Sequence, residues 1–365
     1  MSAGVELSII LPTLNEAENV GSMIERIDDA LTGIAWEAII IDDDSADGTA
    51  DRARDLAGVD DRIRVIQRIG RRGLSSAVIE GFGAAAAPHV AVMDCDHQHD
   101  PALLPAMLRT LRQGDADFCI ASRFARGAST AGWNAPGRKR LSGWGNALAR
   151  SVIGRSLSDP MSGYFMLSSA RARSIAPHLS GIGFKIALDI LAAAGPQMRV
   201  QEFPLCFGER RKGESKLDQG VVFDFLVGLF DRKAGRAIPT RLAVLAVIAA
   251  PGITIAMAVV VALYGAYHFD FAIAQLVAAV LALSADYVVF TALTYRSERP
   301  DEARGIAGHA AIFAACAAIG IAANVTFAVL IHAAGMSWPI AALSGIVVGA
   351  TWNFLVPGRN ILARY

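Results

Sequence analysis

The chain contains 365 residues, of which 53% are hydrophobic and 19% are charged, with 34 basic and 34 acidic side chains. This length suggests about two domains. The low charge and high hydrophobic content exclude a disordered chain and a protein that coats nucleic acid. The spacing of the cysteines is irregular, which is typical of neither a disulfide framework nor a zinc site. They are Cys95, Cys119, Cys206 and Cys316.

Charge is distributed unevenly along the chain. Residues 1–240 carry 28 Lys or Arg and 29 Asp or Glu, whereas residues 241–365 carry 6 and 5. We therefore expect a soluble domain over residues 1–216, a juxtamembrane linker over 217–240 and a transmembrane domain over 241–365. The chain does not open on a basic segment followed by an apolar run, so we expect no signal peptide and a cytosolic first domain.

In the first domain, short apolar runs alternate with amphipathic stretches. The apolar runs predict strands at Leu7–Leu11, Ala38–Ile41, Ile63–Ile66, His89–Met93 and Phe118–Ala121. The amphipathic stretches predict helices at Asn15–Leu31, Thr49–Leu56, Leu74–Ala86 and Pro101–Leu111. Glu18 lies three residues after Asn15, which predicts a capping box at the start of the first helix. This alternation predicts an α/β domain with a mostly parallel sheet covered on both faces, and ligands of such sheets bind beyond the carboxyl ends of the strands.

Acidic and polar residues follow three of the predicted strands, at residues 12–16, 42–49 and 94–98. Asp94 and Asp96 come directly after a buried strand and present hard carboxylate oxygens, which Mg²⁺ or Mn²⁺ prefers. Such an ion bridges phosphate oxygens, and Gln98 adds a carbonyl ligand. The neighbouring His97 and His99 do not make the closed site that zinc prefers. The alternative interpretation is a solvated acidic turn.

The segment after the second strand, residues 42–49, has two compatible interpretations. In one, it forms a turn in which Asp47 or Ser45 caps the helix that starts near Thr49. In the other, Asp43 accepts a hydrogen bond from a nucleotide base. Both hold at once, because the cap and the base acceptor are different residues.

A phosphorylated ligand at this edge requires local cations, because the domain has almost no net charge. The candidates are Arg123 after the fifth strand, residues 138–140 and residues 209–216. For Lys139, Lys212 and Lys233 we favour contact with anionic lipid. Residues 217–230 predict an amphipathic helix at the membrane interface, with burial against the soluble domain as the alternative.

Uncharged runs in the C-terminal domain are long enough for membrane spans, which need about 20 residues. Leu242–Phe269 is an uncharged run of 28 residues, and residues 305–358 form one of 54. Together with Phe271–Tyr295, these runs predict four spans, at about residues 242–265, 272–295, 306–332 and 338–357. Lys and Arg lie before the first span, between the second and third, and after the fourth, so the positive-inside rule places both termini in the cytosol.

Two features of the spans have open interpretations. Gly345 and Gly349 form a Gly-x-x-x-Gly pattern that allows close helix packing, but chance is an equal alternative in a segment rich in Gly and Ala. Asp286 is either a functional carboxylate within the membrane or a structural residue near the cytosolic headgroups, about ten residues from Arg296.

Together these segments resemble the dolichyl-phosphate mannose synthase group of family-two inverting glycosyltransferases, which have a Rossmann-like GT-A fold. The motifs recur in order over most of residues 5–220, at residues 12–16, 42–49, 94–99, 122–123, 138–142, 159–164, 183–185 and 210–216. The four-span tail resembles a GtrA-like membrane domain. His97 stands where the family usually has an apolar residue, and Asp100 where it often has proline. The Gln-x-x-Arg-Trp motif of processive polysaccharide synthases is absent, which argues against polymerisation.

The resemblance implies a role for each matching residue. The residues implied to bind the donor are Pro12, Thr13, Glu16, Asp43, Asp94 and Lys185. Those implied to hold the metal on the diphosphate are Asp94, Asp96 and Gln98. Catalytic roles, mostly contacts with phosphate, fall to Asp96, Arg123, Arg138, Ser142, Arg210 and Lys216.

The implied activity is transfer of mannose from GDP-mannose to a membrane polyprenyl monophosphate such as dolichyl phosphate, with inversion and with Mg²⁺ or Mn²⁺. The acceptor phosphate is largely anionic at pH 7, so no general base is required. The expected partners are the nucleotide sugar, the polyprenyl phosphate and the bilayer, and not nucleic acid. Three alternatives stay open: transfer from UDP-glucose or another sugar nucleotide, a transporter or flippase with a nucleotide-binding head, and a catalytically inactive scaffold.

Overall fold

The computed structural model describes residues 4–129, 149–150, 153, 156–179, 181, 185–208, 240–294 and 306–355. The chain divides into two compact units, residues 1–216 and residues 217–365. Each unit is described by itself. In the second unit, side chains are described for residues 249–286 and 317–352.

The first unit is built around a seven-stranded sheet with the order β3-β2-β1-β4-β6-β5-β7. The strands are β1 Leu7–Thr13, β2 Trp36–Asp42, β3 Ile63–Gln67, β4 His89–Val92, β5 Phe118–Ser122, β6 Phe165–Ser168 and β7 Val200–Pro204. All pairs are parallel except those that β6 makes with β4 and β5. The five predicted strands and the mostly parallel sheet are confirmed. The short strands β6 and β7 were not predicted from the apolar runs.

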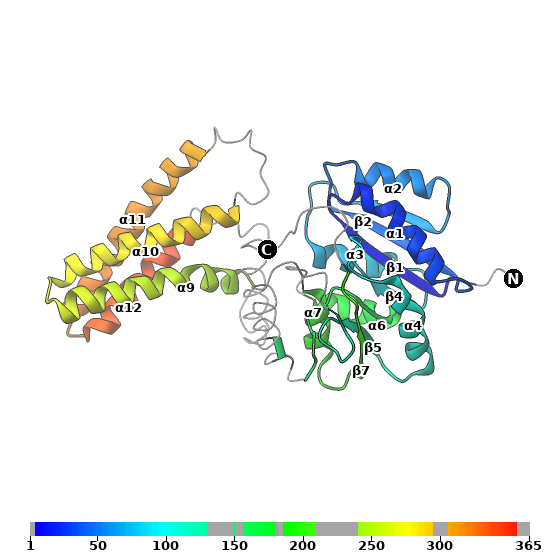
Figure 1. The fold of residues 1–365 in the computed structure, drawn as a ribbon. Coiled ribbons are helices and arrows are strands. Elements are labelled where there is room, and N and C mark those ends of the chain that lie inside the picture. The colour runs from blue at the N-terminus through cyan, green and yellow to red at the C-terminus, as the bar shows by residue number, and fades with distance from the viewer. Residues whose placement is uncertain are drawn as a thin grey trace. The chain divides into compact units, whose positions relative to one another are not determined.

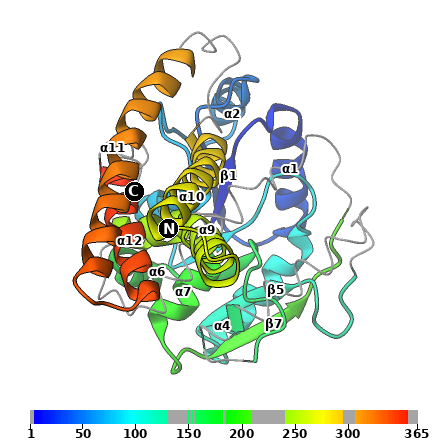
Figure 2. The ribbon, with the colours of Figure 1, turned by 90° about the vertical axis from the view of Figure 1, so that its left-hand side faces the viewer.

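Helices cover both faces of this sheet (Figures 1 and 2). They are α1 Ala17–Ala30, α2 Thr49–Ala57, α3 Leu74–Ala84, η1 Pro101–Leu103, α4 Leu104–Gln113, α6 Ser169–Ile175, η2 Ala176–His178 and α7 Ile186–Ala194. Apolar residues of α1, α2 and α4 pack on one face, and those of α3, α6 and α7 pack on the other. Alternate residues of β1 enter the two cores, Ile9 on the first face and Ile10 on the second. The sheet is therefore buried on both sides, as the continuous apolar runs predict.

The predicted capping box at the start of α1 is wrong. The N-cap is Glu16, whose side chain makes no capping hydrogen bond. Asn15 has a left-handed backbone with φ of 55°, and its side-chain oxygen accepts from the Ala46 N–H at 3.2 Å. The Ala17 N–H at the start of α1 donates to Asp47 Oδ2 at 3.0 Å. Asp47, from the loop after β2, thus caps the N-terminus of α1 in place of a residue adjacent to the helix.

Glu37 fastens several segments together at the amino end of the sheet, away from the strand ends that carry the polar loops. Its carboxylate accepts from Ser8 Oγ at 2.6 Å, from the Ala86 N–H at 2.8 Å and from Arg64 at 3.1 Å. Burial acts to raise the pKa of Glu37, but these donors outweigh it and hold the pKa below its ordinary value of 4.5. The ionised carboxylate therefore stabilises the fold.

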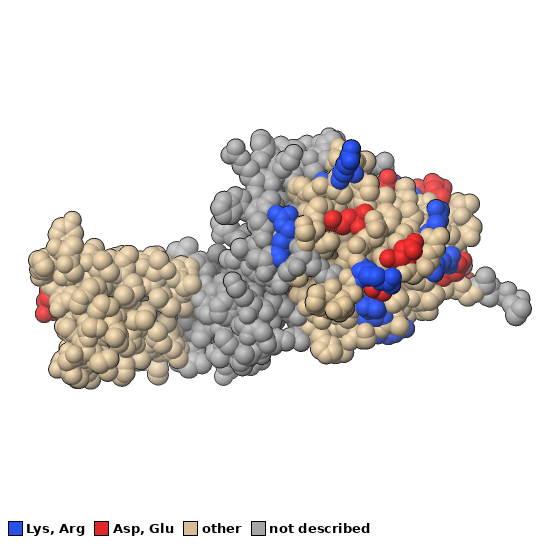
Figure 3. Space-filling view, turned by 90° about the horizontal axis from the view of Figure 1, so that it is seen from below, with Lys and Arg blue, Asp and Glu red and all other residues tan. Residues whose placement is uncertain are grey.

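The second unit contains long apolar helices in its described part. They are α9 Thr240–Val260, the π-helical turn η3 Val261–Ala266, α10 Phe271–Thr294, α11 Ile306–Ala333 and α12 Trp338–Leu355. Residues 249–266 are long and apolar enough to cross a membrane, and three shorter apolar stretches lie in α10, α11 and α12. On the face in Figure 3, charged side chains are scattered over the first unit, whereas the described surface of the second is almost free of them. Whether all four helices span the bilayer stays a prediction.

Small residues and one buried amide pair bring α10, α11 and α12 together. A Cβ on Gly345 would lie 2.4 Å from the Asn324 carbonyl oxygen, and one on Gly349 would lie 2.9 Å from that of Gly320. Gln275 donates to Asn324 Oδ1 at 2.7 Å and to the Ala342 carbonyl at 3.2 Å. Of the two interpretations of the Gly-x-x-x-Gly pattern, close helix packing is the one that the structure confirms.

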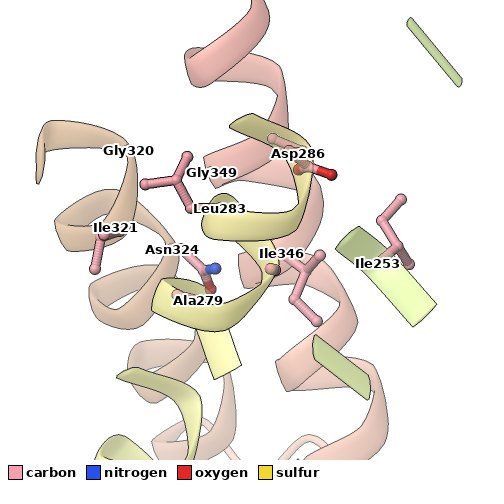
Figure 4. A pocket seen from close by; sticks show the side chains of 11 residues that line it. Ile253, Ala279, Leu283, Asp286, Gly320, Ile321, Asn324, Ile346 and Gly349 are labelled. Atoms are coloured by element: carbon pink, nitrogen blue, oxygen red, sulfur yellow. The ribbon is translucent and has the colours of Figure 1, made fainter. Parts of the chain in front are cut away.

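Asp286 contacts the backbone of α9 at a proline. Its carboxylate lies against Gly252, directly after Pro251 inside the helix, and its Oδ1 is buried without a hydrogen-bond partner among the described residues. A Cβ on Gly252 would lie 2.3 Å from Asp286 Oδ1, so only glycine allows this approach. Asp286 also lines a small pocket with Asn324 and apolar residues of α9, α10, α11 and α12 (Figure 4). The carboxylate is therefore packed among the helices of this unit. In the alternative interpretation, Asp286 lies near the cytosolic headgroups, about ten residues from Arg296. Arg296 lies outside the described residues.

We predict that Glu37→Gln lowers the free energy of unfolding by about 1–2 kcal/mol at pH 7. Because the folded pKa is depressed, this stabilisation is present above about pH 4.5 and is lost as the pH falls through the folded pKa. Urea unfolding of both proteins between pH 3 and 8 measures the difference. Asp51→Asn, in the exposed pair with Arg54, is the control and costs at most about 0.5 kcal/mol. A difference that grows towards acid pH would contradict the prediction.

We predict that Gly252→Ala destabilises the helical unit by about 1–3 kcal/mol, because the new methyl group overlaps the Asp286 carboxylate. Gly265→Ala is the matched control, since its Cβ would meet nothing closer than 3.9 Å. Thermal unfolding of the full chain in detergent measures both. Adding Asp286→Ala to Gly252→Ala relieves the overlap, so the double variant should be more stable than Gly252→Ala. Equal effects of the two glycine variants would contradict the packing.

Candidate active site

The polar loops that the sequence singles out follow neighbouring strands. β1 pairs in parallel with β2 on one side and with β4 on the other, so the three carboxyl ends lie at one edge of the sheet. Thr13 at the end of β1 is opposite Asp42 at the end of β2, and the Met93 N–H just after β4 donates to Ile10 of β1. The edge therefore brings together residues 12–16, 42–49 and 94–99, as expected for a ligand site of a parallel sheet.

The loop after β2 is fixed by its own carboxylates. Buried Asp42 accepts from Thr13 Oγ1 at 3.2 Å and from the Ser45 N–H at 2.9 Å. Asp47 Oδ1 accepts from the Thr49 N–H at 3.0 Å, so the turn is confirmed, but the N-cap of α2 is Gly48 and no side chain caps it. Thr49 Oγ1 in turn accepts from the Glu16 N–H at 2.8 Å. These bonds tie the loop after β1 to the loop after β2.

Asp43 is paired with an arginine that the sequence analysis missed. Arg68 lies just after β3, is 2% exposed, and donates to Asp43 Oδ1 at 2.7 Å. The other oxygen, Oδ2, accepts from the Gly73 N–H at 2.6 Å. Arg68 also donates to the Gly73 carbonyl oxygen and to Ser76 Oγ. Burial raises the pKa of Asp43, against the opposing effects of Gly73 and Arg68.

The segment after β4 turns tightly around Asp96. Asp96 is 4% exposed, and its Oδ1 accepts from the Gln98 N–H at 3.1 Å. The Asp94 side chain is 40% exposed, so its oxygens face open space at the strand end. Gly163 passes close by, where a Cβ would lie 3.5 Å from both Asp94 carboxylate oxygens.

His99 supports Asp94 from within the protein. Its Nδ1 accepts from the Asp94 N–H at 2.9 Å, so the proton of the neutral ring is on Nε2. Nε2 lies 3.7 Å from Asp94 Oδ2, and the ring stacks on buried Tyr164 with 5.2 Å between centroids. Tyr164 in turn donates to the Asp100 carbonyl oxygen at 3.1 Å. His99 is therefore a support for the Asp94 backbone and carboxylate, a role that the sequence analysis did not assign.

The donor set after β4 fits a divalent cation that arrives with its phosphates. Asp94 and Asp96 supply two carboxylates and Gln98 an amide carbonyl. Within the described residues, no group of three or more His, Cys, Asp or Glu side chains is arranged to hold a metal. Mg²⁺ commonly binds through one or two carboxylates and takes its other ligands from substrate phosphate and water. The residues present therefore suit such an ion better than a closed structural site.

Arg123 is held by a buried carboxylate, Asp159. Asp159 is fully buried and accepts from Arg123 Nε at 2.6 Å and Nη2 at 2.8 Å. Lys185 lies close enough to interact with Arg123, Asp159 and Asp94. Burial, followed by the Arg123 charge, lowers its pKa to about 8, against the opposing effects of the two carboxylates. The structure thus brings Arg123 and Lys185 to the Asp94 side of the edge. Asp159 is a further residue whose role the sequence analysis did not assign, although its motif was noted.

Four predicted site residues lie outside the described part of the chain, namely Arg138, Ser142, Arg210 and Lys216. The same holds for Lys139, Lys212, Lys233 and the predicted interfacial helix. Pro12, Thr13, Glu16 and Asp43 lie on the β1–β2 side of the edge, and Asp94, Asp96 and Gln98 lie after β4. The individual roles assigned to these residues stay predictions.

Two family models match this chain. Residues 8–173 match Glycosyl transferase family 2, and residues 246–360 match GtrA/DPMS, transmembrane domain. A dolichol-phosphate mannosyltransferase from Mycosarcoma maydis is 35% identical over 231 residues, which cover 61% of this chain and 78% of that relative. The chain belongs to glycosyl transferase family 2. Its first unit is an inverting glycosyltransferase domain of the GT-A type, and its second unit makes this glycosyltransferase a membrane protein.

Other relatives share the first unit. A dolichol-phosphate mannosyltransferase from Pyrococcus furiosus is 38% identical over 224 residues, and the match spans 61% of this chain and 62% of that relative's length. An undecaprenyl-phosphate mannosyltransferase from Micrococcus luteus is 34% identical over 226 residues, with 60% of this chain and 90% of that relative covered. Glucosyl-3-phosphoglycerate synthase from Mycobacterium tuberculosis, solved with Mn²⁺ and UDP, aligns with a TM-score of 0.47 at 21% identity. The alignment covers 65% of this chain and 81% of that chain.

We predict that Arg68→Met destabilises this glycosyltransferase by about 3–5 kcal/mol, because it leaves the buried Asp43 carboxylate without its charged partner. Arg54→Met is the matched control, since Arg54 pairs with Asp51 at an exposed surface and its loss costs about 0–1 kcal/mol. Urea unfolding followed by circular dichroism measures both. Equal stability of Arg68→Met and the wild type would show that the pair contributes nothing.

Proposed function

We propose that this glycosyltransferase moves mannose from GDP-mannose to a polyprenyl monophosphate in the membrane, with inversion at the anomeric carbon. The observation that carries the proposal is the pairing of an acidic strand-end site, Asp94 and Asp96, with an apolar helical unit in one chain. Relatives named for dolichol-phosphate and undecaprenyl-phosphate mannosyl transfer support both the sugar and the lipid class. They do not favour the glucosyl alternative.

The donor lies across the carboxyl edge of the sheet. Thr13, Glu16 and Asp43 hold the nucleoside on the β1–β2 side, where the Asp43–Arg68 pair fixes the carboxylate. Asp94, Asp96 and Gln98 would hold the divalent cation, Mg²⁺ or Mn²⁺. The ion, when bound, neutralises charge on the donor phosphates and stabilises the departing nucleoside diphosphate.

The acceptor supplies its own nucleophile. A phosphate monoester has a second pKa near 6, so its oxygen is largely anionic at pH 7 and attacks the anomeric carbon without a general base. The bond to the donor phosphate breaks as the new bond forms, which turns an α-linked donor into a β-linked product.

The remaining requirement is to bring two phosphates together despite their like charges. Asp159 holds two guanidinium nitrogens of Arg123, and Lys185 interacts electrostatically with Arg123, Asp159 and Asp94, which supports a role for both cations at the phosphates. Arg138, Ser142, Arg210 and Lys216 complete the phosphate contacts in this proposal. Arg suits this task because its fork of donors binds two phosphate oxygens at once.

The membrane unit keeps the site at the surface where the acceptor phosphate lies. Four spans, with both termini and the catalytic domain on the cytosolic side, agree with the distribution of Lys and Arg. Mg²⁺ and Mn²⁺ both suit the oxygen ligands.

Activity tests the proposal directly. The full chain in detergent is incubated with radiolabelled GDP-mannose or UDP-glucose and a short polyprenyl phosphate, with and without Mg²⁺ or Mn²⁺. We expect a metal-dependent mannosyl lipid with a β linkage by NMR. Asp96→Ala should reduce transfer by about 10³-fold or more, whereas Asp51→Asn on the exposed surface of α2 should retain it.

Two outcomes would overturn the proposal. Transfer from UDP-glucose but not from GDP-mannose would replace the sugar with the glucosyl alternative. Lipid movement across liposomes without donor nucleotide, together with no transfer, would favour a transporter. Unchanged turnover by Asp96→Ala would remove the metal assignment.

A further inference from the structure

His97 occupies an unusual position between two of the proposed metal ligands. Its backbone is left-handed, with φ of 66°, a conformation that few residues other than glycine adopt. The side chain is 5% exposed. This residue therefore sets the direction of the chain between Asp96 and Gln98, and something must hold it in that conformation.

Two residues of α1, Ser22 and Arg26, bind the His97 ring. Arg26 Nη1 lies 3.2 Å from Nδ1, and Ser22 Oγ lies 2.8 Å from Nε2. A guanidinium only donates, so Nδ1 accepts and the ring proton is on Nε2. Nε2–H then donates to Ser22 Oγ, whose hydroxyl donates to the Asn19 carbonyl oxygen at 3.2 Å. Each donor in this chain has an acceptor, and the ring has one orientation.

The same arginine also holds Asp100 on the far side of the turn. Arg26 Nη2 donates to Asp100 Oδ1 at 3.2 Å, and that oxygen accepts from the Ala102 N–H at the start of η1. His97 and Asp100 are therefore joined through one guanidinium.

On the side of the turn away from α1, the segment after β7 packs closely against the backbone of residues 97 and 98. A Cβ on Gly208 would lie 2.9 Å from the His97 carbonyl oxygen, and the Gly208 N–H donates to the Gln98 carbonyl oxygen at 3.1 Å. The turn therefore lies between α1 on one side and the segment after β7 on the other. Its shape depends on both contacts.

We propose that Ser22, Arg26 and Asp100 position His97, and that His97 in turn presents Asp96 and Gln98 to the divalent cation. His97 and Arg26 are positioning residues, because they act through the turn and not on the reacting atoms. The inference rests on the metal role proposed above. It predicts that affinity for the metal falls when the clamp is removed, while the sheet and the donor side remain intact.

Metal binding tests the clamp without relying on turnover. Mn²⁺ is titrated into the full chain in detergent with saturating GDP, and free Mn²⁺ is followed by electron paramagnetic resonance. His97→Gly and Arg26→Gln should each raise the apparent Kd for Mn²⁺ by about 10- to 100-fold, and Arg26→Lys by less. The double variant should be no worse than His97→Gly, because both remove one clamp. Arg54→Gln, in an exposed pair on α2, is the matched control and should bind as the wild type does.

His97→Asn separates the side-chain clamp from the backbone. Asn tolerates a left-handed φ but is too short to reach both Ser22 and Arg26. Weak Mn²⁺ binding by His97→Asn supports the clamp, whereas binding equal to the wild type by both His97→Asn and His97→Gly would overturn it. Activity assays add a second readout. At saturating Mn²⁺ the variants should recover their kcat while the KM for metal stays raised, and a low kcat at every metal concentration would overturn the positioning role.

The controls separate the two proposals. If the wild type binds no Mn²⁺, or if Asp96→Ala binds it equally well, the metal site itself fails, and this inference fails with it. If Asp96→Ala loses binding and His97→Gly does not, the metal site stands and only the clamp is overturned.

Discussion

The parallel pairing of β1 with both β2 and β4 is the constraint on which the rest of the site depends. Parallel strands end at the same edge of a sheet, so one register places Thr13 opposite Asp42 and brings the Asp94 segment beside them. The two apolar cores hold this register, because a shift by one residue would exchange the faces that Ile9 and Ile10 bury. Burial of ordinary aliphatic side chains therefore sets where the polar groups meet.

The acidic groups at this edge are held by contacts from distant segments or from their own turn. Arg68 and Gly73 hold Asp43, the Gln98 N–H reaches Asp96, and His99 supports Asp94. Such contacts explain how several carboxylates share one edge within a domain of almost zero net charge. They also leave Asp94, the most exposed of the three, facing the space where a phosphate–metal complex would bind.

The helical unit is packed with the help of only a few polar groups among its described residues. Gln275 donates to Asn324 in an apolar bundle, and glycines at 252, 345 and 349 allow backbone or carboxylate to approach closely. Unpaired polar groups are costly in lipid, so each of these contacts contributes to the fixed packing of the helices. A family-two catalytic domain joined to this bundle suits an acceptor whose phosphate stays at the membrane surface.

The elements and the kind of site could be predicted from local patterns in the sequence. Continuous apolar runs predicted the five parallel strands, the strand-end position singled out Asp94 and Asp96, and the loss of charge after residue 240 indicated the membrane unit. These signals are local, because the spacing of apolar and polar residues can be read from neighbouring positions in the sequence.

The hydrogen-bond and ion-pair partners depend on how the chain folds in three dimensions. Arg68, 25 residues from Asp43, and Asp159, 36 residues from Arg123, join their partners through contacts between distant segments that no local pattern encodes. For the same reason the capping box at Asn15 is wrong: Asp47, 30 residues away from Ala17, satisfies the helix N-terminus that the local sequence suggested Asn15 would cap. Hydrogen bonding is directional and short-ranged, so its partners are known only once the fold has brought them within about 3 Å.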